Sequence, residues 1–503
     1  MTVALVLAAD ETADIPYGNG PHAPTLLHRW LDRLATLNVP DVHIVARPEN
    51  AARLRKEIDA AATGAVNVQV VESDSPAEDL RVLARVVRDL TEPLLVVPAG
   101  TVASDELVNR LVWHRAEVTA VVAREGDGAP IRQGAVRVVS VGTGFHQVTE
   151  PNGVFRGLLR ITPAKRVTCA KAAEKMAALL ETPDALPGVT DDVAALLLVA
   201  LVRSGVRVQK LREQPLVCRP VRDAAEAAEA RAAVEAIDED RVRLDAAVKS
   251  NDGFFTTFAV STYSRYIARL AARIGATPNM VTSLSMSIAV GAAIAFASGT
   301  RAGMIAGAVL YYFSFVFDCV DGQLARYARK FSTFGAWLDA TFDRAKEYTV
   351  FAGLAVGATA AAADSSVHAG DVWVLAVAAM VAQTVRHMID FSFGAARGAR
   401  PVAPLPVVPL TAAEDGRTPA PAVPAPGPGG LRGLIGRVMA RTRTGPAFWA
   451  KKMIVFPIGE RFAVVSITAA IWNARVTFIA LLCWGAVAAA YTLSGRMLRS
   501  LNR

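Results

Sequence analysis

The part of the chain that follows residue 251 contains six apolar stretches, and this pattern limits the fold more than any other feature. Each stretch can cross a hydrocarbon core of roughly 30 Å as a helix. Buried helices of a large soluble protein are the alternative, but six stretches in succession favour a membrane domain. The pattern predicts an all-α polytopic domain with six transmembrane helices, at about 281–298, 302–320, 345–363, 372–391, 453–472 and 474–494.

The first 220 residues have a different pattern, in which short apolar runs alternate with amphipathic stretches. Residues 24–37 have the spacing of a helix. Strands that alternate with helices favour a mostly parallel sheet, so we expect a soluble α/β domain here. The candidate strands are 3–9, 42–46, 94–99 and 118–123.

Two further segments complete the predicted domain organisation. Residues 221–250 are Ala-rich and charged, which predicts a helical linker between the α/β domain at 1–220 and the membrane domain at 251–503. A long loop at about 395–450 is rich in Pro, Gly and Ala, and we expect it to be disordered. The overall composition, 52% hydrophobic yet 20% charged, fits a soluble part joined to a membrane part.

Basic residues are unevenly distributed among the loops of the membrane domain. They precede the first apolar stretch, follow the second and the fourth, and recur after the last. Because cytoplasmic loops carry an excess of Lys and Arg, both termini are expected in the cytoplasm of a multi-pass cell-membrane protein. The formal net charge of +8 is explained in the same way, and we expect no nucleic-acid partner.

Four aspartates lie where the second apolar stretch ends and the third begins. Asp318, Asp321, Gly322 and Ala325 have helical spacing on one stripe, and Gly335, Asp339 and Asp343 form a second stripe. A turn between the two helices would bring the stripes face to face. The alternative is a purely structural role, in which these acids pair with nearby arginines at the helix ends, namely Arg326, Arg329 and Arg344.

Four carboxylates in a partly dry site require a counter-charge, and a divalent cation supplies one. Oxygen-only ligands favour magnesium, manganese or calcium over zinc. Such an ion would neutralise a diphosphate and stabilise the charge that develops during phosphoryl transfer. Because ionisable residues inside a membrane are costly, four of them at this spacing favour a functional site over chance helix-end pairs.

The same segment matches the pattern D-x2-D-G-x2-A-R-x8-G-x3-D-x3-D and resembles the signature of the CDP-alcohol phosphatidyltransferase family. The resemblance extends over about 250–503. It implies that Asp318, Asp321 and Asp339 bind Mg²⁺ or Mn²⁺, and that Asp343 is a further metal ligand or the general base. It also implies catalytic roles for Asp339 and Asp343. Contacts to the CMP portion are implied for Gly322, Ala325, Arg326 and Gly335, and, from the TPN-x2-T pattern, for Asn279 and Thr282 near the diphosphate.

The family resemblance also implies partners and an activity. The partners are a CDP-alcohol donor, an alcohol or alcohol-phosphate acceptor, membrane lipid and a second copy of the chain, paired through the membrane domain. The expected reaction transfers a phospho-alcohol to the acceptor hydroxyl and releases CMP, in phospholipid or polyol-phosphate synthesis. A catalytically silent scaffold of a lipid-synthesis complex is the alternative function, and an ion transporter is a third one. The acids gather at one membrane edge and do not track across it, which disfavours transport.

The α/β domain loosely resembles sugar-nucleotide and inositol-phosphate cytidylyltransferases, with departures at the positions that carry their chemistry. The loop after the first strand contains no Arg or Lys, and Thr25 stands where those enzymes have a Lys after Pro. Ala99 and Gly100 follow the strand at 94–99, where an acid commonly binds metal. Triphosphate chemistry needs such groups. We therefore expect a degenerate nucleotidyltransferase-like domain that has lost the activity.

Two arginines of the membrane domain are candidates for binding the acceptor. Arg386 falls late in the fourth apolar stretch and Arg461 early in the fifth, at a similar depth to the aspartates. An arginine at that depth is costly unless it has a partner, and a guanidinium suits phosphate. In the alternative interpretation, Arg461 pairs with Glu460 or a lipid phosphate, and Arg386 extends to the membrane surface.

Overall fold

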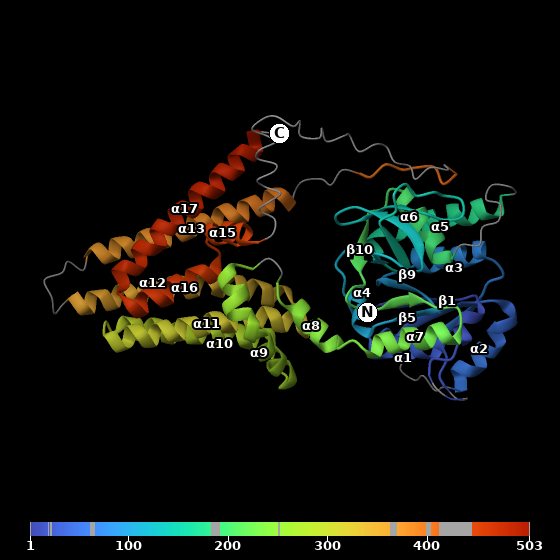
Figure 1. Cartoon of the computed structure of the whole chain (residues 1–503), viewed down its shortest axis with the longest axis horizontal. Coiled ribbons are helices and arrows are strands. Elements are labelled where there is room, and N and C mark those ends of the chain that lie inside the picture. Colours follow the sequence, from blue (N-terminus) through green and yellow to red (C-terminus); the bar gives the residue numbers. More distant parts are fainter. Residues whose placement is uncertain are drawn as a thin grey trace. The chain divides into compact units, whose positions relative to one another are not determined.

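The computed structural model forms two compact units, Met1–Val242 with Val402–Val423, and Arg243–Pro401 with Pro424–Arg503 (Figure 1). Each unit is described separately. The structure describes residues 2–18, 20, 23–60, 66–182, 192–249, 252–362, 370–398, 404–411 and 445–501.

The first unit is built around a nine-stranded sheet in which β1 (Val3–Ala8) is central. Along the main path the strand order is β10-β6-β9-β4-β1-β2-β3. β1 pairs in parallel with its two neighbours, and only β9 (Gly153–Ile161) runs antiparallel within this path. The prediction of a mostly parallel α/β sheet is therefore confirmed. The other strands of this sheet are β2 (Asp41–Ala46), β3 (Asn67–Glu72), β4 (Leu94–Pro98), β6 (Val118–Ala123), β7 (Ala129–Gln133), β8 (Val138–Val141) and β10 (Val208–Arg212). A separate two-stranded antiparallel sheet is formed by β5 (Thr101–Ala103) and β11 (Cys218–Pro220).

Helices cover both faces of this sheet and bury the alternating side chains of its strands. One core contains side chains from α3 (Pro76–Arg88), α5 (Arg166–Glu181) and α6 (Val193–Arg203). The other core contains side chains from α1 (Leu26–Thr36), α2 (Pro48–Ala60) and α4 (Asp105–Val112). This three-layer arrangement leaves the carboxyl ends of the parallel strands free to form a cavity. The unit also contains α7 (Ala224–Glu235), and the division between the units falls within α8 (Glu239–Ala247).

A short segment from far along the chain completes the first unit. Residues 404–411, which follow the helix α13 (Gly370–Gly398), pack on the α/β fold. Val408 donates its backbone N–H to the Arg203 carbonyl at 2.8 Å, and Arg203 donates to the Pro409 carbonyl at 2.8 Å. The Leu410 carbonyl lies 2.8 Å from His146 Nε2, and burial lowers the pKa of His146 to about 4. The rest of the predicted Pro-rich disordered loop lies almost entirely outside the described residues.

The second unit is a helical bundle (Figure 1). An amphipathic helix, α9 (Ser261–Arg273), follows a single π-turn at Thr256–Val260. The longest helices are α10 (Pro278–Ala297), α11 (Arg301–Tyr327), α12 (Thr333–Ala362), α13 and α17 (Ala474–Leu501). Between α13 and α17 lie α15 (Pro446–Ile454) and α16 (Ile458–Ile471), which are bent relative to each other by 75°.

Four helices among the described residues are long and apolar enough to cross a membrane, or five if α15 and α16 form one broken span. These four are α10, α11, α13 and α17. The six predicted spans are therefore not confirmed. The third predicted span belongs to α12, whose stretch at 345–362 still includes the charged residues Lys346 and Glu347. The helical unit is built to cross a membrane several times, and α12 adds a partly charged helix to that bundle.

Glycines permit a close approach between α10 and α12. A Cβ on Gly357 would lie 1.9 Å from the Phe296 carbonyl oxygen, and a Cβ on Gly353 would lie 2.4 Å from the Ala293 carbonyl oxygen. Small residues four apart on one face are typical of helix contacts within membranes. This contact fixes α10 against α12, and both helices carry residues of the site described next.

Candidate functional site

Three carboxylates from two helices converge in the helical unit. Asp318 and Asp321 lie on α11 and Asp339 lies on α12, and one oxygen from each lies within 4.8 Å of the others. Thr282, on α10, donates a hydrogen bond of 2.7 Å to the buried Asp321. Three carboxylates from rigid helices form the oxygen-only donor set that Mg²⁺ or Mn²⁺ prefers, so the residues present fit such an ion. The two predicted stripes do face each other at these three positions.

The fourth aspartate lies beside a lysine that the sequence analysis did not consider. Lys346 is fully buried on α12 and contacts Asp318. Its Nζ also lies 3.3 Å from Asp343 Oδ1 and 3.1 Å from the Ser285 hydroxyl on α10. Asp343 is absent from the group of three convergent carboxylates. The signal that could have identified Lys346 is its position three residues after Asp343, on the same helical stripe.

Two of the arginines named as possible partners of the aspartates, Arg326 and Arg344, form other contacts. Arg326 donates Nε to the Ala247 carbonyl. Arg344 donates to the Ala340 carbonyl, and its guanidinium lies 4.8 Å from the centre of the Phe391 ring. Lys346 is a cation in direct contact with Asp318 and Asp343.

The residues predicted to contact the nucleotide lie around the same helix ends. A Cβ on Gly335 would lie 2.6 Å from the amide oxygen of Asn279, so the start of α12 approaches the start of α10. A Cβ on Gly322 would lie 3.3 Å from the Arg326 guanidinium, and Ala325 is half-buried on the same helix. A larger side chain at Gly335 would displace Asn279, and one at Gly322 would crowd the Arg326 guanidinium.

Both acceptor candidates line one cavity of about 450 Å³, whose other walls are mainly apolar residues of α13 and α17. Arg461 donates to Glu347 on α12 at 2.8 Å, and Glu347 is also bound by Gln383 at 2.8 Å. Arg386 donates to the Val455 carbonyl at 2.8 Å. Glu460, the partner considered for Arg461, instead accepts from the backbone N–H of Phe255 at 3.3 Å. Arg461 thus forms a buried ion pair, whereas Arg386 has only a backbone contact among these bonds.

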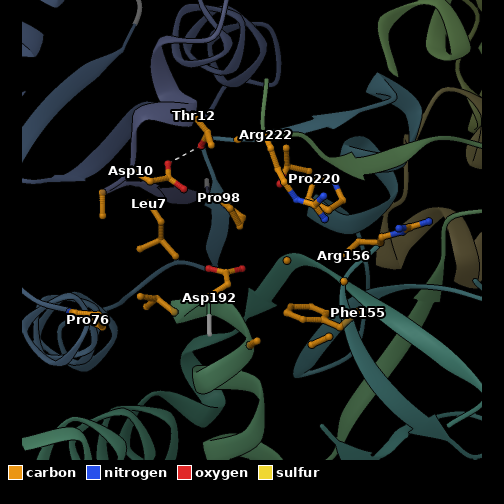
Figure 2. A pocket seen from close by; sticks show the side chains of 18 of the residues that line it. Leu7, Asp10, Thr12, Pro76, Pro98, Phe155, Arg156, Asp192, Pro220 and Arg222 are labelled. Carbon is orange, nitrogen blue, oxygen red and sulfur yellow. Dashed lines mark hydrogen bonds between the residues drawn. The ribbon is translucent and has the colours of Figure 1, made fainter. Parts of the chain in front are cut away.

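The α/β unit has a separate cavity of about 640 Å³ at the carboxyl ends of β1 and β4 (Figure 2). Its basic side chains already have acidic partners. Arg47 is bound by Asp79 at 2.9 and 3.0 Å, and Arg156 is bound by Glu213 at 2.8 and 3.1 Å. No lysine lines the cavity among the residues that the structure describes.

The positions where the α/β unit departs from the cytidylyltransferase pattern have structural roles. Thr25 caps helix α1 by accepting the His28 backbone N–H at 3.3 Å. A Cβ on Gly100 would lie 2.2 Å from Thr12 Oγ1, so an acid at this position would displace Thr12. Asp192 was not predicted from the sequence; its carboxylate lies in the cavity (Figure 2) and caps α6 by accepting the Ala194 N–H at 3.1 Å. The short capping residue before an apolar helix was the available signal.

Comparisons with known proteins address the two units separately. No curated protein matches the chain. The N-terminal region resembles solved nucleotidyltransferase structures. One is an inositol-1-phosphate CTP transferase from T. maritima, with 12% identity and a TM-score of 0.35 over 46% of this chain and 96% of that chain. Another is a 4-diphosphocytidyl-2C-methyl-D-erythritol synthase from Anaerococcus prevotii, with 13% identity and a TM-score of 0.33 over 46% of this chain and 96% of that chain.

The match for the helical unit covers the complete acidic segment. It begins just before α10, includes α11 and α12, and extends beyond α13. The resemblance that the aspartate signature indicated is thereby confirmed. Residues 276–412 of the chain match the family model described as CDP-alcohol phosphatidyltransferase.

Proposed function

We propose that this protein is a multi-pass membrane phosphotransferase that moves the phospho-alcohol of a CDP-alcohol to an acceptor hydroxyl and releases CMP. The observation that carries this proposal is the convergence of Asp318, Asp321 and Asp339 within 4.8 Å, inside the segment that matches the family model. The family match supports the reaction class. A silent scaffold would not need three costly carboxylates converging at the ends of apolar helices.

The chain's own residues supply binding and proton transfer in this reaction. Asp318, Asp321 and Asp339 would hold Mg²⁺ or Mn²⁺, which when bound neutralises diphosphate charge. Gly322 and Gly335, where the family resemblance implies contacts to the nucleotide, would receive the CMP portion. Asp343 would accept the proton of the acceptor hydroxyl, the role of general base that the family resemblance implies, with the Lys346 Nζ 3.3 Å from its Oδ1.

In the proposed reaction one P–O bond forms and one breaks, and no further reactant is needed. The acceptor oxygen forms a bond to the β-phosphorus as the bond between that phosphorus and the oxygen bridging to the α-phosphorus breaks. CMP departs with that oxygen, and the acceptor's proton passes to Asp343. Arg326 would help to neutralise the diphosphate if CMP binding draws it away from the Ala247 carbonyl.

The reaction is tested with the full-length protein purified in detergent. It is incubated with Mg²⁺ and a panel of CDP-alcohols, including CDP-diacylglycerol and CDP-polyols, together with alcohol or alcohol-phosphate acceptors. CMP release coupled to a product of the expected mass supports the proposal. If no donor and acceptor pair gives turnover, the catalytically silent scaffold becomes the better account.

The basic residues of the loops support a proposal for the orientation of the site in the membrane. We propose that both termini and the aspartates face the cytoplasm of the cell membrane, because Arg326, Arg329 and Lys330 lie at the end of α11 that carries the aspartates. Labelling of single cysteines placed beside Lys330 in sealed cells tests this orientation, and labelling from outside would contradict it. The homodimer expected from the family resemblance stays a prediction.

We predict that Arg386 binds the acceptor when the acceptor carries phosphate. Arg386→Ala should raise the acceptor KM about 10- to 100-fold, because a hydrogen bond to a charged group contributes about 1.5–3 kcal/mol. The KM for the CDP-alcohol should change little. Steady-state kinetics with each substrate varied in turn measure both values. Arg301→Ala is the matched control, since Arg301 is exposed and donates to the Trp472 carbonyl.

Arg461 also lines this cavity, but its removal is a less direct test. Arg461→Ala would leave the buried Glu347 without its cation, and such a loss costs about 3–5 kcal/mol. A change in the acceptor KM of that variant could therefore come either from weaker acceptor binding or from a less stable fold. If Arg386→Ala affects only the CDP-alcohol, or neither substrate, the acceptor-phosphate pocket should be abandoned.

We also predict that the α/β unit does not make the CDP-alcohol. The guanidinium groups of Arg47 and Arg156 are held by carboxylates, and Gly100 leaves no space for a metal-binding acid. The full chain should release no pyrophosphate from CTP with any polyol phosphate. Sustained pyrophosphate release that survives Asp321→Asn would place nucleotidyl transfer in the α/β unit and contradict this prediction.

A further inference from the structure

Lys346 is a buried cation inside a group of acids, and the reaction described above does not use it. Its side chain has no exposed surface, contacts Asp318, and lies 3.3 Å from Asp343. Burying an ammonium group costs several kcal/mol unless charged or polar partners surround it. Asp318, Asp343 and Ser285 provide those partners, so the sequence places a fixed positive charge between two of the four aspartates.

The position of this ammonium bears on how many metal ions the site can hold. Paired metal ions in phosphoryl-transfer sites lie about 3.5–4 Å apart and share carboxylate ligands. An ion that bridged Asp318 and Asp343 would occupy the space around the Lys346 Nζ, which already contacts both carboxylates. The other carboxylates, Asp321 and Asp339, are grouped with Asp318 within 4.8 Å, and Asp343 is outside this group.

We propose that Lys346 takes the place of a second divalent cation, so that the site binds one ion on Asp318, Asp321 and Asp339. Lys346 is a positioning residue in this arrangement: it orients Asp318 toward the ion and holds Asp343 apart from it. The inference rests on the proposed function, because it concerns the same metal site. In this arrangement Asp318, Asp321 and Asp339 are metal ligands and Asp343 is not, although all four belong to the same sequence pattern.

The test is the number of Mn²⁺ ions bound per chain, measured on the full-length protein in detergent from the electron paramagnetic resonance signal of free Mn²⁺. The wild-type protein should bind one ion in this site. Lys346→Arg keeps the positive charge and should also bind one. Lys346→Met removes the charge with little change in length, frees Asp318 and Asp343, and should bind two.

A second comparison does not depend on the folding of the Lys346 variants. Asp343→Asn in the otherwise unchanged protein should still bind one ion, because Asp343 is not a ligand in this arrangement. Two ions in the wild type, with one lost in Asp343→Asn, would overturn the inference. One ion in a folded Lys346→Met protein would overturn the role of the lysine. Failure of the wild type to bind any Mn²⁺ would instead remove the metal site of the proposed function.

Discussion

Asp321→Asn should lower kcat/KM for CMP release by at least about 10³-fold, which corresponds to about 4 kcal/mol of lost transition-state stabilisation. Asp321 is the most buried of the three convergent carboxylates, and Thr282 holds its orientation with a hydrogen bond of 2.7 Å. An amide in its place keeps the shape but removes one negative charge that the metal needs. Asp318→Asn and Asp339→Asn should have losses of similar size, and excess chelator should abolish turnover of the wild type.

A matched control separates this loss from a general effect of removing a charge. Asp371 begins α13, is exposed, and lies 3.9 Å from Arg475. Asp371→Asn should leave kcat/KM unchanged, and all variants should elute as folded protein during size-exclusion chromatography. Full activity of Asp318→Asn, Asp321→Asn or Asp339→Asn, or of the wild type in chelator, would refute the metal site. Asp343→Asn should also lose turnover, because no carboxylate would then accept the proton of the acceptor hydroxyl.

Gly357→Val should destabilise the helical unit by about 3 kcal/mol or more, because its Cβ would lie 1.9 Å from the Phe296 carbonyl oxygen. The clashing atom belongs to backbone, so α12 must move away from α10 instead of rearranging a side chain. That movement would also displace Thr282 and Ser285, which are hydrogen-bonded to Asp321 and Lys346. Thermal unfolding followed by size-exclusion chromatography measures the loss of stability.

Gly291→Val is the control for the glycine substitution. Gly291 lies on α10, the partner of α12 in this contact, but a Cβ there meets only a Leu310 methyl group at 3.9 Å. The two variants add the same side chain to helices of the same bundle. Equal stability of Gly357→Val and Gly291→Val would mean that α10 and α12 are not in close contact at this position.

The convergence of Asp318, Asp321 and Asp339 could be predicted because these residues follow helical periodicity. Asp318 and Asp321 are three apart on one helix, and Asp339 occupies a stripe on the next, so a tight turn suffices to bring them together. The same spacing places Lys346 beside Asp343 but could not show that its ammonium group would also reach Asp318. That outcome depends on the path of a long, flexible lysine side chain and on Ser285, which comes from another helix.

The surroundings of Arg461 show a different limit. Its partner Glu347 lies 114 residues earlier in the chain, and only the packing of α16 against the bundle brings the two together. Adjacency in sequence favoured Glu460, although consecutive residues of a helix point in different directions. The number of membrane-spanning helices was similarly difficult to predict. The second half of α12 is apolar, whereas its first half carries Asp339 and Asp343.

The α/β fold could be predicted from its apolar runs, but the sequence did not show what completes it. The candidate strands correspond to β1, β2, β4 and β6, which lie inside the sheet or beside its core. The antiparallel β9 was not predicted, since its sequence, GVFRGLLRI, mixes arginines and glycines with apolar residues. Arg156 and Arg160 within this strand are buried.

The segment 404–411 has a consequence for the order in which the protein is made. The chain leaves the ribosome from its N-terminus, so the α/β unit emerges first and can begin to fold at once. Leu410 and the carbonyl that faces His146 emerge only after α13 has been synthesised. The first unit to be translated is therefore among the last to be finished, and until then the nascent chain exposes the surface around His146 and Arg203 to chaperones.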